Sequence, residues 1–220
     1  MEITWFGHSC FRLRDRGVAV ITDPFASSVG CALPCLKADI VTISHHHPHH
    51  DDISAIQGAY RVFDAPGEYE VLSVFITGIA TYPTCKDILP DEWIRWRNVV
   101  FVFEFDGLTV CHLGDLKYIP PQEQMQMLSG VNVLLVPVGG GTHSLSAAKA
   151  AEIVRLVEPS VVIPMHYRVG NMSAELEGIE RFLKEMGMGR SNPLETLKIS
   201  TANLPQETQV VLLAPMASTP

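Results

Sequence analysis

The sequence predicts an α/β fold in which two packed sheets carry helices on their outer sides. Short segments with strand character follow one another in the first half of the chain, whereas helical and strand segments alternate after residue 115. No linker, repeat or change of composition divides the 220 residues, and 47% of them are hydrophobic, enough for one substantial core. We therefore expect a single domain over residues 1–220.

The first half of the chain begins with apolar and β-branched segments. They predict strands over residues 3–6, 10–14, 18–22 and 39–43. The tripeptide Asp15-Arg16-Gly17 predicts a hairpin turn, and residues 24–36, rich in Ser, Gly, Pro and Cys, predict a loop. The last of these strands runs directly into a group of histidines.

The middle of the chain continues in the same way. Strands are expected over residues 69–76, 99–105 and 109–112, with Asp106-Gly107 as a hairpin turn. Residues 82–98 hold prolines, mixed charge and two tryptophans, and we expect a loop or lid there.

Helices enter after residue 115. We expect helices over residues 121–128, 145–157 and 173–185, and strands over residues 131–137, 161–164 and 210–213. Pro121 suits the first turn of a helix, and Ser144 or Ser146 suits the cap of the next one.

Composition excludes several classes of protein. The formal net charge of −8 argues against a broad basic surface, so no nucleic-acid partner is expected. The apolar runs are far shorter than the roughly 18 residues of a membrane-spanning helix, and the first residues do not read as a secretory leader. Five cysteines cannot all pair and lack the spacing of a disulfide scaffold. We expect a cytoplasmic protein with a small-molecule substrate, and leave open whether it forms a homo-oligomer.

Five of the nine histidines lie together after the strand predicted over residues 39–43. They are His45, His46, His47, His49 and His50. In an extended segment His45 and His47 point to the same side, and the turn at Pro48 can bring His49 and His50 to a neighbouring position. A tag or a solvated loop explains this segment less well, because it is internal and follows a well-formed strand. The spacing predicts a site for two adjacent metal ions.

Two further metal-ligand candidates follow separate strands. Asp115 comes after a predicted strand and Gly114, where its carboxylate could bridge two cations. His166 lies just past another buried strand. Taken alone, Asp115 is as often a turn residue and His166 more often a packing residue. With the histidine group in the same chain, we interpret both as ligands.

The chain as a whole resembles the metallo-β-lactamase superfamily, in particular its branch of zinc-dependent hydrolases similar to L-ascorbate-6-phosphate lactonase. The motifs that carry the resemblance are Gly7-His8-Ser9-Cys10-Phe11, Asp23-Pro24-Phe25, the histidine group, His112-Leu113-Gly114-Asp115, Val138-Gly139-Gly140 and Ile163-Pro164-Met165-His166-Tyr167. The resemblance covers nearly the whole chain, and the motifs are specific in order and spacing. It implies an αββα four-layer sandwich with one or two metal ions at an edge of the two sheets.

The resemblance also implies a role for each ligand. His45 and His47 would bind one metal, and His50 the other. Asp115 would bridge the pair and His166 would complete the second site. Asp23 would orient a ligating imidazole, a support that metal-bound histidines usually need. We expect His8 and His112 to pack beside the ligands.

Two departures from the family pattern bear on the metal. The family motif His-x-His-x-Asp-His has His49 in place of its aspartate here, so a nitrogen ligand replaces an oxygen and favours zinc over manganese or iron. If His49 does not ligate, it is a candidate general base. The family also places a ligand histidine after the strand corresponding to Val74–Ile79, where this chain has Tyr82-Pro83-Thr84. Cys85, His112 or water would then complete the first metal site.

These features predict a metal-dependent hydrolase. One or two zinc ions, or manganese or iron, would lower the pKa of a bound water to near 7, and the hydroxide would attack an ester, lactone or phosphodiester. His49 or Asp115 would steer the water as catalytic residues. The alternative is a degenerate member of the same fold that binds a metal or ligand without catalysis, which the two departures motivate. A nuclease or a diiron oxidoreductase fits less well, because the chain lacks a basic domain, a Glu within the histidine group and a flavin domain.

Overall fold

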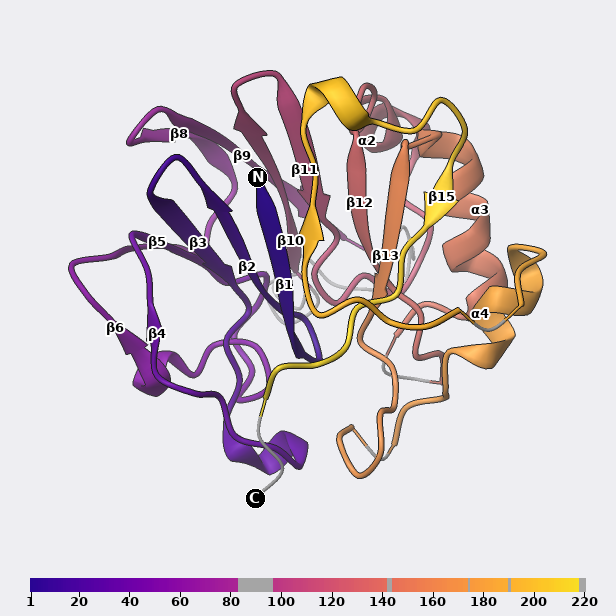
Figure 1. Ribbon diagram of the computed structural model, residues 1–220, viewed down its shortest axis with the longest axis horizontal. Coiled ribbons are helices and arrows are strands. Elements are labelled where there is room, and N and C mark those ends of the chain that lie inside the picture. Colours follow the sequence, from indigo (N-terminus) through magenta and orange to yellow (C-terminus); the bar gives the residue numbers. More distant parts are fainter. Residues whose placement is uncertain (83–96, 142–143, 174, 190, 218–220) are drawn as a thin grey trace.

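Two large β-sheets form the centre of the molecule (Figure 1). The computed structural model describes residues 1–82, 97–141, 144–173, 175–189 and 191–217. The six-stranded sheet has the order β14 (Leu197–Lys198), β1 (Glu2–Gly7), β2 (Cys10–Asp15), β3 (Val18–Thr22), β5 (Ile40–Thr42) and β7 (Arg61–Phe63). The seven-stranded sheet has the order β15 (Gln209–Val210), β13 (Val161–Met165), β12 (Val133–Pro137), β11 (Leu108–His112), β10 (Asn98–Phe105), β9 (Val74–Thr81) and β8 (Gly67–Val71). A short pair joins β4 (Leu36–Lys37) and β6 (Ile56–Gln57).

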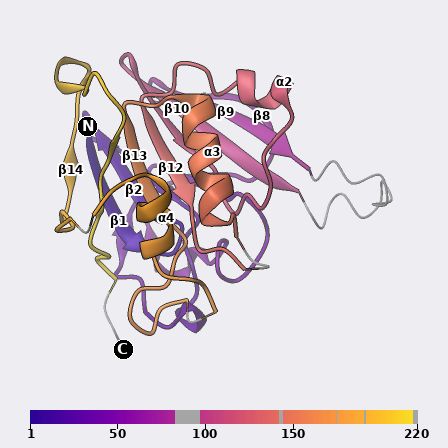
Figure 2. The same ribbon diagram turned by 90° about the vertical axis from the view of Figure 1, so that its right-hand side faces the viewer.

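The described α-helices all come after β11 in the chain. They are α2 (Gln122–Gln126), α3 (Ala147–Val157) and α4 (Glu180–Glu185). Figure 2 shows α3 and α4 beside β12 and β13, on the outside of the seven-stranded sheet. The helix α3 begins where Ser146 caps it, because the Ser146 hydroxyl accepts the Lys149 N–H at 3.4 Å. Ser146 is one of the two serines, Ser144 and Ser146, that the sequence offers as the cap of this helix.

Alternation of side chains divides the six-stranded sheet into two buried faces. Ile3, Trp5 and Val20 point into a core shared with the seven-stranded sheet. Phe6 and Ile21 point the opposite way, into a second cluster that also contains Leu36 of β4 and Ile56 of β6. The outer face of this sheet is therefore covered, among the described residues, by the β4–β6 pair and short 3-10 turns at η1 (Ser27–Val29) and η2 (Ile53–Ala55). The predicted fold class is confirmed, with few helices.

The carboxyl ends of several strands meet at one edge of the molecule. In the seven-stranded sheet β11, β12 and β13 are parallel, so all three end on the same side. In the other sheet β3 and β5 are parallel. β1 runs in the same direction as β3, because both β1 and β3 are antiparallel to β2, which lies between them. All of these strands except β12 end close to a polar residue that the sequence predicts for the site, so the shared edge brings distant segments together.

Most predicted elements are confirmed within one or two residues, but the strand predicted over residues 210–213 is only β15, and two other predictions are wrong. The strand predicted over residues 69–76 is a hairpin of β8 and β9, with its turn at Leu72 and Ser73, which have φ of 50° and 63°. Their side chains do not mark a turn of this type, which usually contains Asn or Gly. The helix predicted over residues 173–185 is only α4, because Ser173 adopts φ 52° and bonds to His8 instead of capping a helix.

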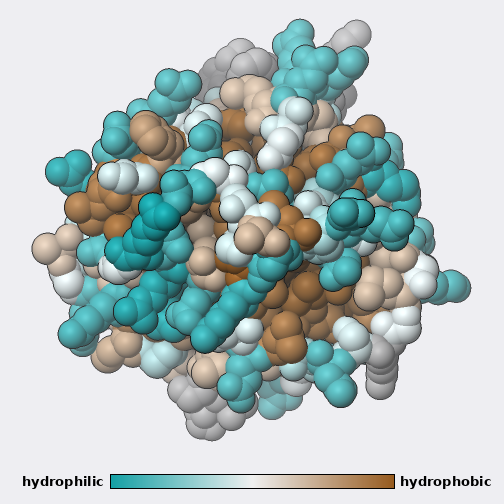
Figure 3. Space-filling view, turned by 45° about the horizontal axis from the view of Figure 1, so that its top comes forward, coloured by the Kyte–Doolittle hydropathy of each residue, from teal (hydrophilic) through white to brown (hydrophobic). Residues whose placement is uncertain are grey.

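The surface mixes hydrophilic and hydrophobic side chains. In Figure 3, where the top of Figure 1 comes forward, hydrophilic side chains cross the middle of the face and hydrophobic ones show between them. Among the described residues, no helix is both long enough and apolar enough to cross a membrane.

Candidate metal centre

Loops at the carboxyl ends of the strands bring the candidate ligands together. His8 follows β1, Asp23 follows β3, His45 and His50 follow β5, Asp115 follows β11 and His166 follows β13. Backbone hydrogen bonds tie the two sheets to each other at this edge. The His166 N–H donates to the His8 carbonyl at 2.9 Å, and the Val99 N–H donates to the Ser44 carbonyl at 2.8 Å. Residues far apart in the sequence are thus held in fixed relative positions.

One group of donor atoms contains His45, His50 and Asp115, whose ligand atoms all lie within 4.8 Å of one another. His45 Nε2 lies 3.8 Å from Asp115 Oδ2, and His166 Nδ1 lies 3.7 Å from Asp115 Oδ1. The two carboxylate oxygens of Asp115 therefore face two different imidazoles. This is the arrangement that a carboxylate bridging two cations requires.

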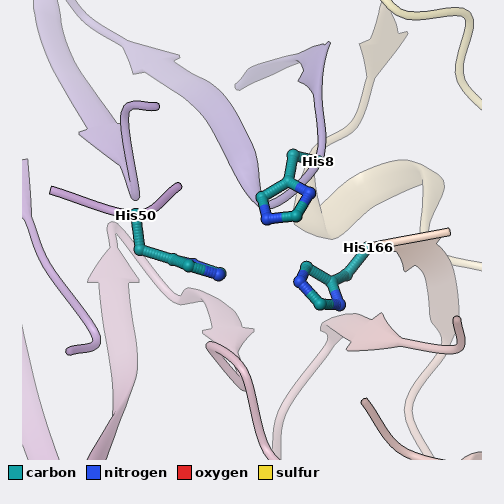
Figure 4. A group of neighbouring side chains, drawn as sticks. All are labelled: His8, His50 and His166. Atoms are coloured by element: carbon teal, nitrogen blue, oxygen red, sulfur yellow. The ribbon is translucent and has the colours of Figure 1, made fainter. Parts of the chain in front are cut away.

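A second group contains His8, His50 and His166, also within 4.8 Å of one another and all buried. The ring centroids are 4.8 Å apart for His8 and His50, 5.3 Å for His50 and His166, and 4.1 Å for His8 and His166. Figure 4 shows the three imidazoles converging on one space from three different elements. His50 belongs to both groups and links them.

Asp23 holds two of these imidazoles in place. Its buried carboxylate accepts hydrogen bonds from the Ser44 N–H at 2.8 Å and from the Ser44 hydroxyl at 2.6 Å, and lies 3.0 Å from His50 Nδ1. The Ser44 hydroxyl gives its single proton to Asp23, so at 3.2 Å from His45 Nδ1 it accepts the His45 proton. Both imidazoles then carry their proton on Nδ1 and present Nε2 to the site. Asp23 thus orients an imidazole, as predicted.

A buried amide positions Asp115. Asn98 Oδ1 accepts the Asp115 N–H at 2.9 Å, and Asn98 Nδ2 donates to the Leu113 carbonyl at 3.0 Å. Gly114 adopts φ 62°, and a Cβ there would collide with Asn98 and Ser44. The tight glycine turn before Asp115 is therefore required by its close approach to the opposite sheet.

His112 supports the same turn and has no free nitrogen. Its Nδ1 accepts the Gly114 N–H at 3.2 Å, so its Nε2 carries the proton and donates to the Ser9 carbonyl at 2.9 Å. Both ring nitrogens are satisfied, and His112 is not available to complete the first metal site. The prediction that it packs beside the ligands is confirmed.

Three residues of the site have a strained backbone. His8, Asp23 and His166 have φ of 50°, 37° and 52°, in the left-handed region that non-glycine residues seldom adopt. Such residues cost on the order of 1–3 kcal/mol each and persist where the surrounding structure holds them. Here a hydrogen bond between the two sheets joins His166 to His8, and hydrogen bonds with Ser44 and His50 hold Asp23.

Burial sets the protonation state of the donors. Loss of solvation lowers the pKa of His8 to about 3 and that of His45 to about 4. The same cause holds the pKa values of His50 and His166 well below their ordinary range. Burial raises the pKa of Asp115 to about 7, although Lys117 acts in the opposite direction. The imidazoles are therefore neutral at pH 7, the state in which histidine binds a metal.

The buried polar atoms of this site fit a divalent cation. His8 Nε2, His166 Nδ1 and Asp115 Oδ1 are all buried and have no hydrogen-bond partner. An unsatisfied buried polar atom costs about 1–3 kcal/mol, so atoms of this kind on neighbouring side chains favour a bound partner. Two nitrogens and a carboxylate oxygen are ligands that zinc accepts.

Two predicted ligands lie outside these groups. Among the described residues, neither His47 nor His49 joins a group of three donors within 4.8 Å. His47 is exposed and its ring centroid lies 6.0 Å from that of His45, while His49 is half-buried with its ring 5.7 Å from that of His8. Their roles as ligands stay predictions. Cys85, considered for the first metal site, lies outside the described residues.

Lys117 is a site residue that the sequence analysis missed. Its Nζ lies 3.1 Å from Asp115 Oδ2, and its side chain is 37% exposed. Its position two residues after Asp115 is the one sequence feature that could have drawn attention to it. Asn98 was missed as well, because a single asparagine at the start of a strand gives no signal of its contacts.

Comparison with known proteins identifies the family of the chain. The sequence profile of the family described as "Beta-lactamase superfamily domain" matches residues 2–166. A UPF0173 protein from Pyrococcus abyssi is 28% identical over 200 residues, which are 84% of this chain and 91% of that protein. A UPF0173 metal-dependent hydrolase from Methanopyrus kandleri is 26% identical over 216 residues, covering 86% of this chain and 94% of the relative. The lactonase-like branch within the superfamily stays a prediction.

Solved structures show the same fold. A protein from Thermotoga maritima, assigned to the zinc-dependent hydrolases of the metallo-β-lactamase superfamily, superposes with a TM-score of 0.77 at 36% identity, covering 96% of this chain and 97% of that one. An isothiocyanate hydrolase from Delia radicum gut bacteria is 15% identical with a TM-score of 0.67, which shows the fold alone. By its sequence match and by its architecture, this chain belongs to the metallo-β-lactamase superfamily.

Proposed function

We propose that the chain is a metal-dependent hydrolase that cleaves an ester, lactone or phosphodiester bond. One observation carries the proposal: neutral imidazoles and one carboxylate from four separate loops converge, and three of their donor atoms are buried without a hydrogen-bond partner. The relatives named as metal-dependent hydrolases support it. The cytoplasmic location, the oligomeric state and the absence of a nucleic-acid partner stay predictions.

The residues of the site would hold one or two zinc ions. When bound, zinc supplies a Lewis acid that polarises the scissile oxygen and lowers the pKa of water to near 7. Asp115 offers one carboxylate oxygen toward His45 and the other toward His166, so its side chain would serve both positions. Asp23 keeps the Nε2 atoms of His45 and His50 directed at the site throughout the reaction.

His49 suits the role of general base. Its half-buried ring lies beside His8 and His47, and burial together with the charge of His47 lowers its pKa. A neutral imidazole at this position can accept a proton from water at the edge of the site. The same group would return that proton to the leaving oxygen.

Lys117 points to an anionic substrate. In the described structure its ammonium group pairs with Asp115, whose carboxylate would be engaged by a cation in the loaded enzyme. The ammonium group would then be free to pair with a carboxylate or phosphate of the substrate. We therefore favour a negatively charged ester, lactone or phosphodiester over a neutral one.

A screen with defined metal content tests the proposal. The purified chain is loaded with zinc, manganese or iron and assayed with activated esters, lactones and phosphodiesters. We expect turnover of at least one class, and its loss together with bound metal in the Asp115→Ala variant. Full metal occupancy without turnover of any class would favour the non-catalytic alternative.

A further inference from the structure

His8 lies in the turn between β1 and β2, outside the histidine group after β5. Its backbone is fixed on two sides, because its carbonyl accepts the indole N–H of Trp5 at 3.1 Å and the N–H of His166 at 2.9 Å. Only 4% of the residue is exposed. A residue held this firmly in a left-handed conformation has little freedom in where it directs its side chain.

The two ring nitrogens of His8 have different surroundings. Nδ1 lies 2.8 Å from the hydroxyl of Ser173, which comes from the far end of the chain. Nε2 is buried and has no hydrogen-bond partner. When Nδ1 carries the proton and donates it to Ser173, Nε2 directs a lone pair into the space shared with His50 and His166. A histidine that binds a metal usually donates a hydrogen bond from one ring nitrogen and binds the metal through the lone pair of the other.

His49 is less well placed than His8 to bind a metal ion in this space. Its ring is half-buried, and among the described residues it joins no group of three donors, whereas His8 does. The ring centroid of His8 lies 4.1 Å from that of His166 and 5.7 Å from that of His49. His8 is therefore closer to His166 than to His49.

We propose that His8 is a metal ligand through Nε2, that it binds one cation together with His50 and His166, and that His49 is not a ligand. The inference rests on the proposed metal dependence and goes beyond it, because it assigns a ligand that lies outside the histidine group. Three imidazoles make this site selective for borderline cations such as zinc over manganese, since nitrogen ligands suit zinc better.

Metal titration of single variants tests the assignment. The metal-stripped full-length chain is titrated with zinc in competition with a chromophoric chelator, and bound zinc is counted per chain. We expect His8→Ala to lose tight binding of one equivalent, by at least about a hundredfold in affinity. His49→Ala should retain every equivalent that the wild type binds. His46→Ala is the matched control, since His46 is exposed and lies in neither donor group.

A result in which His8→Ala keeps the wild-type affinity for every equivalent would overturn the proposal. So would loss of an equivalent in His49→Ala with none lost in His8→Ala. A wild-type chain that binds no zinc at all would instead refute the proposed function, so the two failures are distinguishable.

Two further measurements cover the case in which His8→Ala does not fold. Ser173→Ala leaves the imidazole in place but removes its hydrogen bond, and should weaken one equivalent by about 10- to 100-fold. In the wild type, ¹⁵N spectra of the histidine rings should show the Nε2 resonance of His8 moving to a metal-bound position when zinc is added. An Nε2 resonance of His8 that does not respond to zinc contradicts the assignment.

Discussion

The Nδ1 atom of His50 lies 3.0 Å from Oδ2 of Asp23, and both side chains are buried. Because the same carboxylate also accepts two hydrogen bonds from Ser44, it is surrounded by donors. It therefore fixes which nitrogen of His50 is free, and through the Ser44 hydroxyl it does the same for His45. Two ligands of the proposed metal site depend on one residue that would not touch the metal.

Replacing Asp23 with Asn should weaken metal binding by about 10- to 100-fold. The amide has the shape of the carboxylate but turns an N–H₂ group toward one of its three donor neighbours. Competition with a chromophoric chelator measures the affinity. Asp106→Asn is the control, because Asp106 is exposed and pairs with Arg16 away from the site. Equal affinities of the two variants would show that Asp23 does not orient the ligands.

Gly139→Ala should destabilise the protein and loosen the site. A Cβ at Gly139 would overlap the backbone carbonyl oxygen of His166, and backbone cannot move aside as a flexible side chain can. We expect the free energy of unfolding to fall by about 1–3 kcal/mol and metal affinity to fall with it. Gly189→Ala is the control, because nothing lies within 4 Å of a Cβ there. Urea unfolding measures the stability of both variants, and competition with a chelator measures their metal affinity. A Gly139→Ala variant as stable as wild type would contradict the close approach.

The metal-free protein should lose stability as the pH falls from about 6.5 toward 4. The pKa values of His8 and His45 are about 3 and about 4 in the fold against an ordinary 6.5, so in this window only the unfolded chain takes up their protons. Asp115 acts in the opposite sense, since its pKa of about 7 in the fold lies above the ordinary 3.8. The histidines outnumber it, because burial lowers the pKa values of His50 and His166 as well. Urea midpoints in chelator that rise on acidification would disprove this.

His49→Gln should lower kcat by about a hundredfold without changing the metal content. Glutamine keeps a polar side chain at the edge of the site but cannot accept the proton. The acid limb of the pH profile of kcat should also disappear, which a merely structural role would not produce. Loss of metal in this variant would instead make His49 a ligand.

Lys117→Met should raise KM for an anionic substrate by about tenfold and leave KM for a neutral ester unchanged. The ammonium group of Lys117 is partly exposed beside Asp115, so removing it removes one attraction for a negative group. Lys117→Arg keeps the charge and is the matched control. A rise in KM of equal size for both substrates would argue against charge recognition.

The strand pattern and the positions of the strand ends are readable from the sequence to a large extent. Hydrophobic alternation locates β1, β2 and β3, and Asp106-Gly107 and Arg16-Gly17 mark hairpins whose residues do have positive φ. The turn at Leu72 and Ser73 is not readable, because the tertiary structure imposes positive φ on residues that do not favour it. The same holds for Ser173, whose hydroxyl serves His8 and not a helix.

The candidate site is readable only in part. A dense histidine group followed by Asp115 and His166 at strand ends indicates a metal site, because strand ends of packed sheets converge. The contribution of His8 depends on a strained turn and on hydrogen bonds between the two sheets, which no local pattern encodes. Asn98 and Lys117 act through single contacts with Asp115, and such contacts appear only once the chain is folded.

Anomalous diffraction from crystals grown with zinc tests the central claim most directly. We expect a zinc peak within about 2.0–2.2 Å of donor atoms of His8, His50 and His166. A second peak would lie between His45 and Asp115. Crystals grown with excess zinc that show no anomalous peak among these residues would contradict the proposed metal site. A zinc peak found only elsewhere on the chain would contradict it as well.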